Sequence, residues 1–210
     1  MPIDLNTAAN ERTRGASWDI DVKTNLGDVR ISINQLLFYT RLNHPLVLVN
    51  TAGGKLELQN SAGHISSKGM ETNLRVVLNR LKLFVGYTCT NANTYFGAQK
   101  EWLLLTARHR LNNLMLYEIE QKFKVDVEVY YFSKKKLSGV SEGRSYWLAG
   151  LIAEKTWKEF SLFINFENLT NTRQSKFERI FTGTIDQPVF KDIYASVKGF
   201  VANGGIRIRL

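Results

Sequence analysis

Three histidines, one cysteine and several closely spaced carboxylates are the residues of this chain that could support catalysis or metal binding. Cys89 is the only cysteine, so neither an intrachain disulfide framework nor a cysteine-rich zinc site can form. His44, His64 and His109 have no spacing to another histidine, cysteine or carboxylate that matches a known metal motif. The chain also lacks a glycine-rich phosphate loop and a nucleophile elbow. We therefore expect no enzymatic activity, no catalytic residue, no bound metal and no cofactor.

Two of the histidines are candidates for contact with a ligand. His44 and His64 lie in or near the first long loop, residues 41–69, where they could contact a small molecule. The alternative is a solvated loop histidine without a ligand, which is the more common role of such a residue. His109 is flanked by two arginines, a placement typical of the hydrated end of a strand.

Carboxylates occur in pairs that are two positions apart. Asp126 and Glu128 form one such pair, and Asp19 and Asp21 form another. In a β-strand, residues i and i+2 point to the same side of the sheet, so the members of each pair share a face. No arrangement of partner residues suits general acid–base catalysis. A solvated or structural role is the simpler interpretation.

The dominant periodicity of the chain is two, which indicates β-strands. From Phe123 to Tyr131 the odd positions are apolar, and the even positions are charged or polar. A strand of this kind buries only one face against an apolar environment. Similar segments predict an all-β chain of about nine long strands with no helix. Strong alternation covers 18–23, 29–34, 81–87, 123–131, 160–167 and 205–210, and weaker alternation covers 71–78, 109–120 and 145–155.

The connections between these strands alternate strictly between short and long. Short turns are expected near Gly27, Arg80, Lys122 and Lys158. A small hairpin, residues 46–49 with 55–58, is expected within the first long connection. The long connections cover 41–69, 91–108, 133–145 and 169–197.

Composition excludes several classes of protein. The chain carries 28 Lys+Arg against 19 Asp+Glu, for a net charge of +9. Its only basic run is 134–136, so nucleic-acid binding is not predicted. No apolar stretch approaches the roughly 20 residues of a membrane-spanning helix. The N-terminal residues do not resemble a secretion signal, so we expect none in this chain.

Two architectures are compatible with the alternation. A soluble β-sandwich binding module places apolar side chains inward, between two packed sheets. A transmembrane β-barrel places them outward and uses strands of roughly ten residues, with short turns on one side and long loops on the other. The strand lengths and the alternating connections favour the barrel. Aromatic residues near strand ends also suit a barrel, where they form girdles at the membrane interfaces: Trp18, Tyr39, Tyr87, Tyr131 and Trp157.

The C-terminal third of the chain resembles TonB-dependent outer-membrane receptors. Residues 162–174 are similar to the penultimate strand of the family and the start of the loop that follows it. Residues 188–195 and 199–210 are similar to the end of the family's barrels. Upstream, residues 32–43 and 68–73 resemble earlier barrel hairpins, so the resemblance covers nearly the whole chain.

This resemblance implies an antiparallel up-and-down β-barrel of roughly 22 strands, plugged by an N-terminal globular domain. Such receptors lie in the cell outer membrane. They import a scarce ligand, such as a ferric siderophore, haem or cobalamin, with energy from a TonB complex that contacts the plug. The short turns would be periplasmic and the long loops extracellular. A passive outer-membrane channel is an alternative function. In a barrel, the polar strand faces line the lumen, where carboxylates would pair with arginines or with the plug: Arg75, Arg110, Asp126, Glu128, Arg207 and Arg209.

Nothing in residues 1–210 resembles the plug or a TonB box. The chain is therefore expected to be the C-terminal end of a larger receptor barrel, from a truncated gene, an internal start or processing. About nine strands is an odd number, whereas bacterial single-chain barrels use even numbers. We expect the fragment alone to be inactive. Its expected partners are outer-membrane lipid, the missing plug and strands, and an unknown small-molecule ligand.

Overall fold

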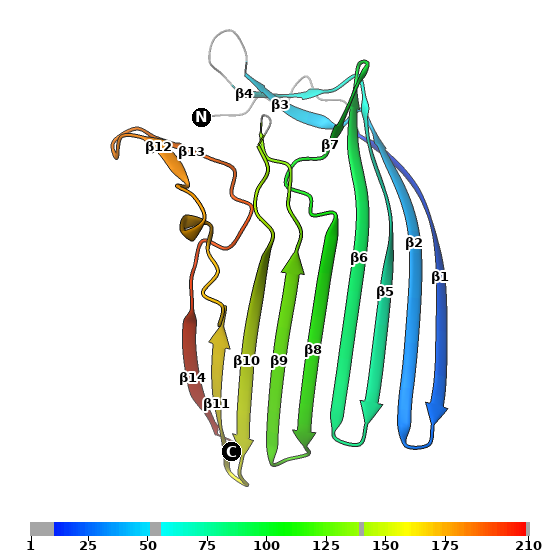
Figure 1. The fold of residues 1–210 in the computed structure, drawn as a ribbon, viewed down its shortest axis with the longest axis vertical. Helices are drawn as coiled ribbons and strands as arrows, with labels where there is room; N and C mark the ends of the chain where they lie inside the picture. The colour runs from blue at the N-terminus through cyan, green and yellow to red at the C-terminus, as the bar shows by residue number, and fades with distance from the viewer. Residues whose placement is uncertain (1–10, 51–55, 139–140, 209–210) are drawn as a thin grey trace.

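The computed structural model describes residues 11–50, 56–138 and 141–208. These residues form one 10-stranded antiparallel sheet, in which each long strand pairs with the next long strand along the chain (Figure 1). The short strand β7 (Gln99–Trp102) pairs only with β6. The nine long strands, in sheet order, are β1 (Arg12–Leu26), β2 (Val29–Asn43), β5 (His64–Leu78), β6 (Leu81–Phe96), β8 (His109–Ile119), β9 (Phe123–Phe132), β10 (Tyr146–Thr156), β11 (Phe160–Glu167) and β14 (Val201–Ile208).

Four short turns connect the strands at one end of the sheet. Three of them contain a residue with a positive φ: Gly27 at 59°, Asn79 at 50° and Gln121 at 58°. Such backbone conformations reverse the chain within a few residues and match the twist of antiparallel strands. The fourth turn joins β10 to β11 through residues 157–159. All four turns lie where the sequence predicts them.

The long connections meet at the opposite end of the sheet (Figure 1). The first contains the expected hairpin, formed by β3 (Leu46–Asn50) and β4 (Leu56–Asn60). The last contains the 3-10 helix η1 (Gln174–Lys176) and a second hairpin, β12 (Phe181–Gly183) with β13 (Pro188–Phe190), which the sequence did not predict. Among the residues that the structure describes, no helix is long and apolar enough to cross a membrane.

Three of the central strands are longer than predicted. Residues 41–43 belong to β2, 64–69 to β5 and 91–96 to β6, although the sequence assigned them to loops. Their side chains are mostly polar on both faces, so no apolar alternation marks them. Their backbone groups nevertheless pair across the ladder, which satisfies their hydrogen bonds without an apolar environment.

The strand register assigns every side chain to one of two faces, because directly opposed residues of an antiparallel pair point the same way. Asp126 of β9 lies opposite Leu116 of β8 and Ile152 of β10, so the three side chains share a face. When the register is followed across the whole sheet, nearly all charged side chains of the strand interiors lie on this face. They are Asp19, Asp21, Lys23, Arg30, Glu71, Arg75, Lys82, Arg110, Glu118, Lys124, Asp126, Glu128, Glu154, Glu167 and Arg207.

The opposite face carries a continuous apolar belt. Val127 lies there, opposite Met115 and Leu151. Phe123 and Tyr131 mark the two edges of the belt on β9, separated by roughly 27 Å along the strand. Charged side chains interrupt this face only towards strand ends. On the described strands these are Arg12, Arg14, Arg41, Lys68, Lys100 and Lys155.

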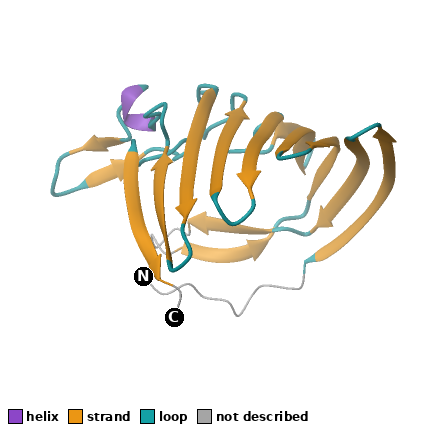
Figure 2. Ribbon diagram, turned by 90° about the horizontal axis from the view of Figure 1, so that it is seen from below, coloured by secondary structure: helices purple, strands orange, loops and turns teal. Residues whose placement is uncertain are grey.

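The sheet is bent into an open arc, and the polar face lies on its concave side. Figure 2 shows the β3–β4 hairpin within the arc. Val47 of β3 lines a pocket together with Ile65 of β5 and with Thr94 and Phe96 of β6, which all belong to the polar face. The apolar belt therefore covers the convex side of the arc.

This arrangement excludes the soluble β-sandwich. A sandwich requires a second sheet packed on the apolar face, and the described residues contain only one large sheet and two small hairpins. Large apolar side chains of the convex face remain exposed, such as Trp18 at 60% and Ile164 at 48%. The few buried apolar residues among those described cannot form the core of a soluble domain of this length.

Candidate functional site: the concave face and the long-loop end

The structure places the polar residues singled out from the sequence on one surface. Arg75, Arg110, Asp126, Glu128 and Arg207 all point to the concave face of the sheet. Arg209 lies outside the described residues. That this face lines a barrel lumen remains a prediction, because the arc is open.

The expected partners of the lumen carboxylates are arginines or the plug, and no arginine fills this role for Asp126 or Glu128 in the described residues. Within the described residues neither carboxylate forms an ion pair. Glu128 Oε2 accepts a hydrogen bond from the Tyr130 hydroxyl at 2.7 Å, and Asp126 Oδ1 is buried without a partner. The register explains this result, since it places Asp126 between two aliphatic side chains. Arg207 does pair, but with Glu154, at 3.2 Å.

A pocket of 420 Å³ lies on the concave face below the last long loop. Glu128 and Tyr130 line one side of it, and Asn165 and Glu167 line the other. Asn165 Nδ2 donates a hydrogen bond to Glu167 Oε1 at 2.9 Å, which fixes the orientation of this carboxylate. The pocket therefore presents hydrogen-bond acceptors, and it suits donor groups of a ligand or of a protein domain that fills the arc.

The two candidate histidines occupy different environments. His44 is exposed, has a φ of 53° and lies just before the β3–β4 hairpin. His64 is not a loop residue but the first residue of β5, where its ring stacks on Tyr95 with 4.5 Å between ring centroids. Arg41 Nη2 lies 3.3 Å from His64 Nδ1. The register puts this group on the convex face, so His64 does not point towards the concave surface.

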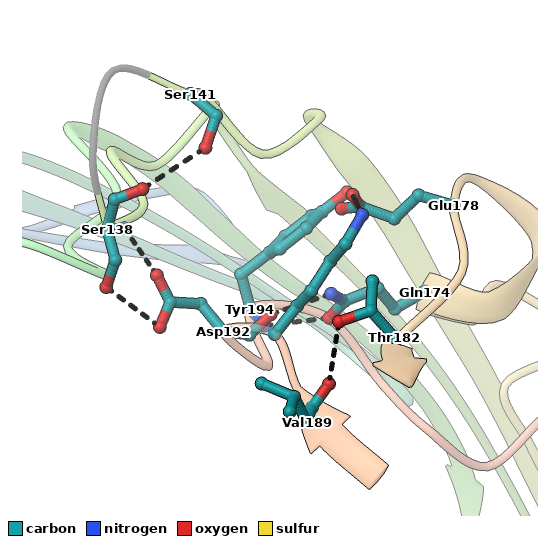
Figure 3. Close-up of polar contacts among 9 residues, drawn as sticks. Ser138, Ser141, Gln174, Glu178, Thr182, Val189, Asp192 and Tyr194 are labelled. Carbon is teal, nitrogen blue, oxygen red and sulfur yellow. Dashed lines mark hydrogen bonds and ion pairs between the residues drawn. The ribbon is translucent and has the colours of Figure 1, made fainter. Parts of the chain in front are cut away.

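The residues that sequence reasoning missed form a link between two long loops, which we call the loop clasp (Figure 3). Its centre is Gln174, whose side chain is fully buried. Gln174 Nε2 donates to the Asp192 carbonyl at 2.7 Å, and Oε1 accepts from the amides of Tyr194 at 2.9 Å and Ala195 at 3.3 Å. One side chain thus satisfies three backbone groups of the loop segment 192–195.

The segment around Tyr194 is in turn held by the loop that precedes β10. Lys135 Nζ donates to the Tyr194 carbonyl at 2.7 Å, and the Tyr146 hydroxyl donates to the same oxygen at 3.0 Å. Burial lowers the pKa of Lys135, and the nearby charge of Arg110 adds to this effect. Burial also raises the pKa of Tyr194. These groups are packed rather than solvated, unlike typical loop side chains.

Further contacts connect residues 136–138 to the last long loop and to the loop that precedes β8. The Asp192 carboxylate accepts hydrogen bonds from the backbone amide and the hydroxyl of Ser138 (Figure 3). Lys136 Nζ lies 2.6 Å from Glu101 Oε2, and the Leu105 amide donates to the Lys136 carbonyl at 2.9 Å. Three of the four long connections are therefore tied together at this end of the sheet.

Replacing Gln174 with Leu should release this link. Each buried backbone group left without a partner costs about 1–3 kcal/mol. We expect faster hydrogen exchange at residues 192–195 and new protease cleavage between 171 and 199. The matched control is Gln187→Leu, because Gln187 is exposed in the same loop. Unchanged protection in the Gln174 variant would show that the clasp does not hold the loop.

No group of three or more His, Cys, Asp or Glu residues suitable for a metal ion occurs in the described part of the chain. The arrangement of strands instead defines a class of protein. A curved antiparallel sheet with an uncharged convex belt, a charged concave face, short turns at one end and long loops at the other has the architecture of a transmembrane β-barrel wall.

Comparison with known proteins specifies the fold further. No protein-family model and no curated sequence matches the chain. Among solved structures, the FrpB iron transporter from Neisseria meningitidis (F3-3 variant) superposes with a TM-score of 0.63 and 14% identity over 95% of this chain. The pyoverdine outer membrane receptor FpvA from Pseudomonas aeruginosa superposes with a TM-score of 0.61 and 14% identity over 94% of this chain. For the ferric-catecholate import receptor Fiu from Escherichia coli K12, the TM-score is 0.56 and the identity is 17% over 76% of this chain.

These neighbours are TonB-dependent outer-membrane receptors, and the chain has the fold of their barrel region. It covers only 32% of the FrpB chain, 30% of the FpvA chain and 24% of the Fiu chain. The resemblance inferred from the sequence is thus confirmed for the fold. None of the three is described as an enzyme.

Proposed function

We propose that this chain forms the C-terminal part of the barrel of a TonB-dependent receptor in the cell outer membrane. The observation that carries the proposal is the division of charge between the two faces of one curved sheet. A convex belt without charged residues suits lipid, and a concave face rich in charged residues suits a hydrated lumen or a plug domain. The short turns would then be periplasmic, and the long loops extracellular.

The transported ligand of the complete receptor is proposed to be a scarce small molecule, such as a ferric siderophore, haem or cobalamin. The fold neighbours favour the first class, since they are described as an iron transporter, a ferric-catecholate import receptor and a pyoverdine receptor. The plug and the TonB complex are proposed partners of the complete receptor. The pocket lined by Glu128 and Glu167 lies on the concave face, which would face the plug in a complete receptor.

Energy dependence of uptake tests this function. In cells that produce the complete receptor, uptake of radiolabelled ferric siderophores, haem and cobalamin should be measured with and without TonB. We expect saturable uptake of one of these ligands that stops when TonB is removed. Uptake that continues without TonB and rises linearly with concentration would instead identify a passive channel.

A further inference from the structure

A group of cations occupies the convex face at the long-loop end of the sheet. The lower part of this face is the apolar belt, so charged side chains are unexpected so close to it. All members of the group are exposed. They belong to β1, β2, β5 and β7 and are Arg12, Arg14, Arg41, Lys68 and Lys100.

The register brings three of these cations close together. Arg14 of β1 lies directly opposite Arg41 of β2. Lys68 of β5 lies opposite Tyr39, which is two positions from Arg41 on the same face. Cross-strand neighbours of equal charge repel one another. Three cations on three adjacent strands therefore favour an anion between them.

The protein itself supplies no such anion in the part of the chain that the structure describes. None of the five cations forms an ion pair there, and no strand carries a carboxylate on this part of the convex face. Arg41 is nevertheless oriented. Its Nε donates to Asn43 Oδ1 at 3.0 Å, and its Nη2 lies 3.3 Å from His64 Nδ1. A guanidinium held in this way is partly organised to bind an oxyanion.

The height of the group above the apolar belt indicates the kind of anion. Trp18 is four residues from Arg14 on β1, roughly 13 Å along the strand. Met70 is two residues from Lys68 on β5, roughly 7 Å. The headgroup layer of a bilayer lies at about this distance from the hydrocarbon. Long cationic side chains reach into that layer from a strand.

We propose that Arg14, Arg41 and Lys68, flanked by Arg12 and Lys100, bind the phosphate groups of a membrane lipid in the leaflet on the long-loop side. This inference rests on the proposed function, because it requires the convex belt to face lipid. A lipid fits better than free phosphate, since the adjacent belt covers its acyl chains while the cations hold its headgroup. In an outer membrane, the lipid class is the phosphorylated glycolipid of the outer leaflet.

The test uses the complete receptor purified in detergent, with bisphosphorylated lipid A as the probe. The triple variant Arg14→Gln, Arg41→Gln, Lys68→Gln should bind the probe more weakly, by roughly fivefold for each cation removed and on the order of a hundredfold for all three. Its control is Lys134→Gln, Arg144→Gln, Lys176→Gln, which removes the same charge from the long loops. This control should bind nearly as tightly as the unmodified receptor. The variant Arg14→Lys, Arg41→Lys keeps the charges but loses the oriented guanidinium groups, so it should bind more tightly than the triple variant and more weakly than the unmodified receptor.

Two further arms distinguish the source of the phosphate. Dephosphorylated lipid A should bind the unmodified receptor as weakly as bisphosphorylated lipid A binds the triple variant, and inorganic phosphate at millimolar concentration should not displace the lipid. Equal binding by the triple variant and the unmodified receptor, or an equal loss in the loop control, would overturn the inference. A separate measurement asks whether each receptor is a folded barrel in native membranes, as shown by heat-modifiable migration on a gel. If the unmodified receptor does not show this migration, the proposed function is refuted rather than the lipid site.

Discussion

Replacing Val127 with Arg in the complete receptor should destabilise the barrel by about 2–4 kcal/mol, the cost of a cation on the lipid-facing side near the bilayer midplane. Val127 is the central residue of the convex face of β9, and its neighbours in the register are Met115 and Leu151. None of these side chains can pair with the new charge. Urea titration of the barrel, folded into vesicles of a short-chain phosphatidylcholine, measures the loss of unfolding free energy.

The same substitution at the adjacent residue, Asp126, provides the comparison for this prediction. Asp126→Arg places the same side chain on the concave face, where water or polar groups can solvate it, and should cost much less. Val127→Leu controls for the change in volume and should be nearly neutral. Equal losses for Arg at positions 126 and 127 would show that the two faces of β9 are assigned incorrectly.

Residues 1–210 expressed alone should not yield a folded monomer in water. Among the residues that the structure describes, β1 pairs only with β2, and β14 pairs only with β11, so both edges of the arc are open there. In lipid, each unpaired backbone group on such an edge costs several kcal/mol. In water, the convex belt would be exposed to other copies, and edge strands of this kind add further strands from neighbouring chains. Ile206 and Ile208 on β14 are 66% and 69% exposed.

We therefore expect the isolated chain to form aggregates and to transport nothing. When it is joined to the rest of a receptor barrel, the same residues should become heat-modifiable on an electrophoresis gel. Size-exclusion chromatography and circular dichroism in buffer without detergent provide the check. A monodisperse, β-rich monomer under these conditions would contradict the open arc and restore the soluble alternative.

The hairpin framework was predictable because its signals are local. Positive-φ positions at Gly27 and Asn79 and the alternation of 123–131 depend only on neighbouring residues. The upper parts of β2, β5 and β6 were not predictable, because both faces of these segments are polar above the apolar belt. The facing of β10 was also ambiguous from the sequence, since Ala149, Gly150, Leu151 and Ile152 are apolar on both faces. The register resolves it by pairing Leu151 with Val127.

The candidate site was predictable only in part. Residue type and alternation placed Arg75, Asp126 and Glu128 on a polar surface, but not their partners, which depend on strand register. Gln174 gave no signal at all, because a glutamine in a polar loop is normally solvated. Its burial depends on two segments far apart in the sequence, 133–145 and 192–195, which meet only in the folded sheet.

The most direct test of the central claim is the accessibility of the two ends of the sheet on intact cells. Cys89 is first replaced by Ser in the complete receptor, and single cysteines are then introduced at Gly27, Lys122, Ser138 or Thr184. A membrane-impermeant thiol reagent should label the cysteines at 138 and 184 on whole cells, and those at 27 and 122 only after the outer membrane is permeabilised. Labelling of positions 27 and 122 on whole cells, with positions 138 and 184 protected, would contradict the proposed orientation of the barrel. Labelling of all four on whole cells would contradict its insertion in the membrane.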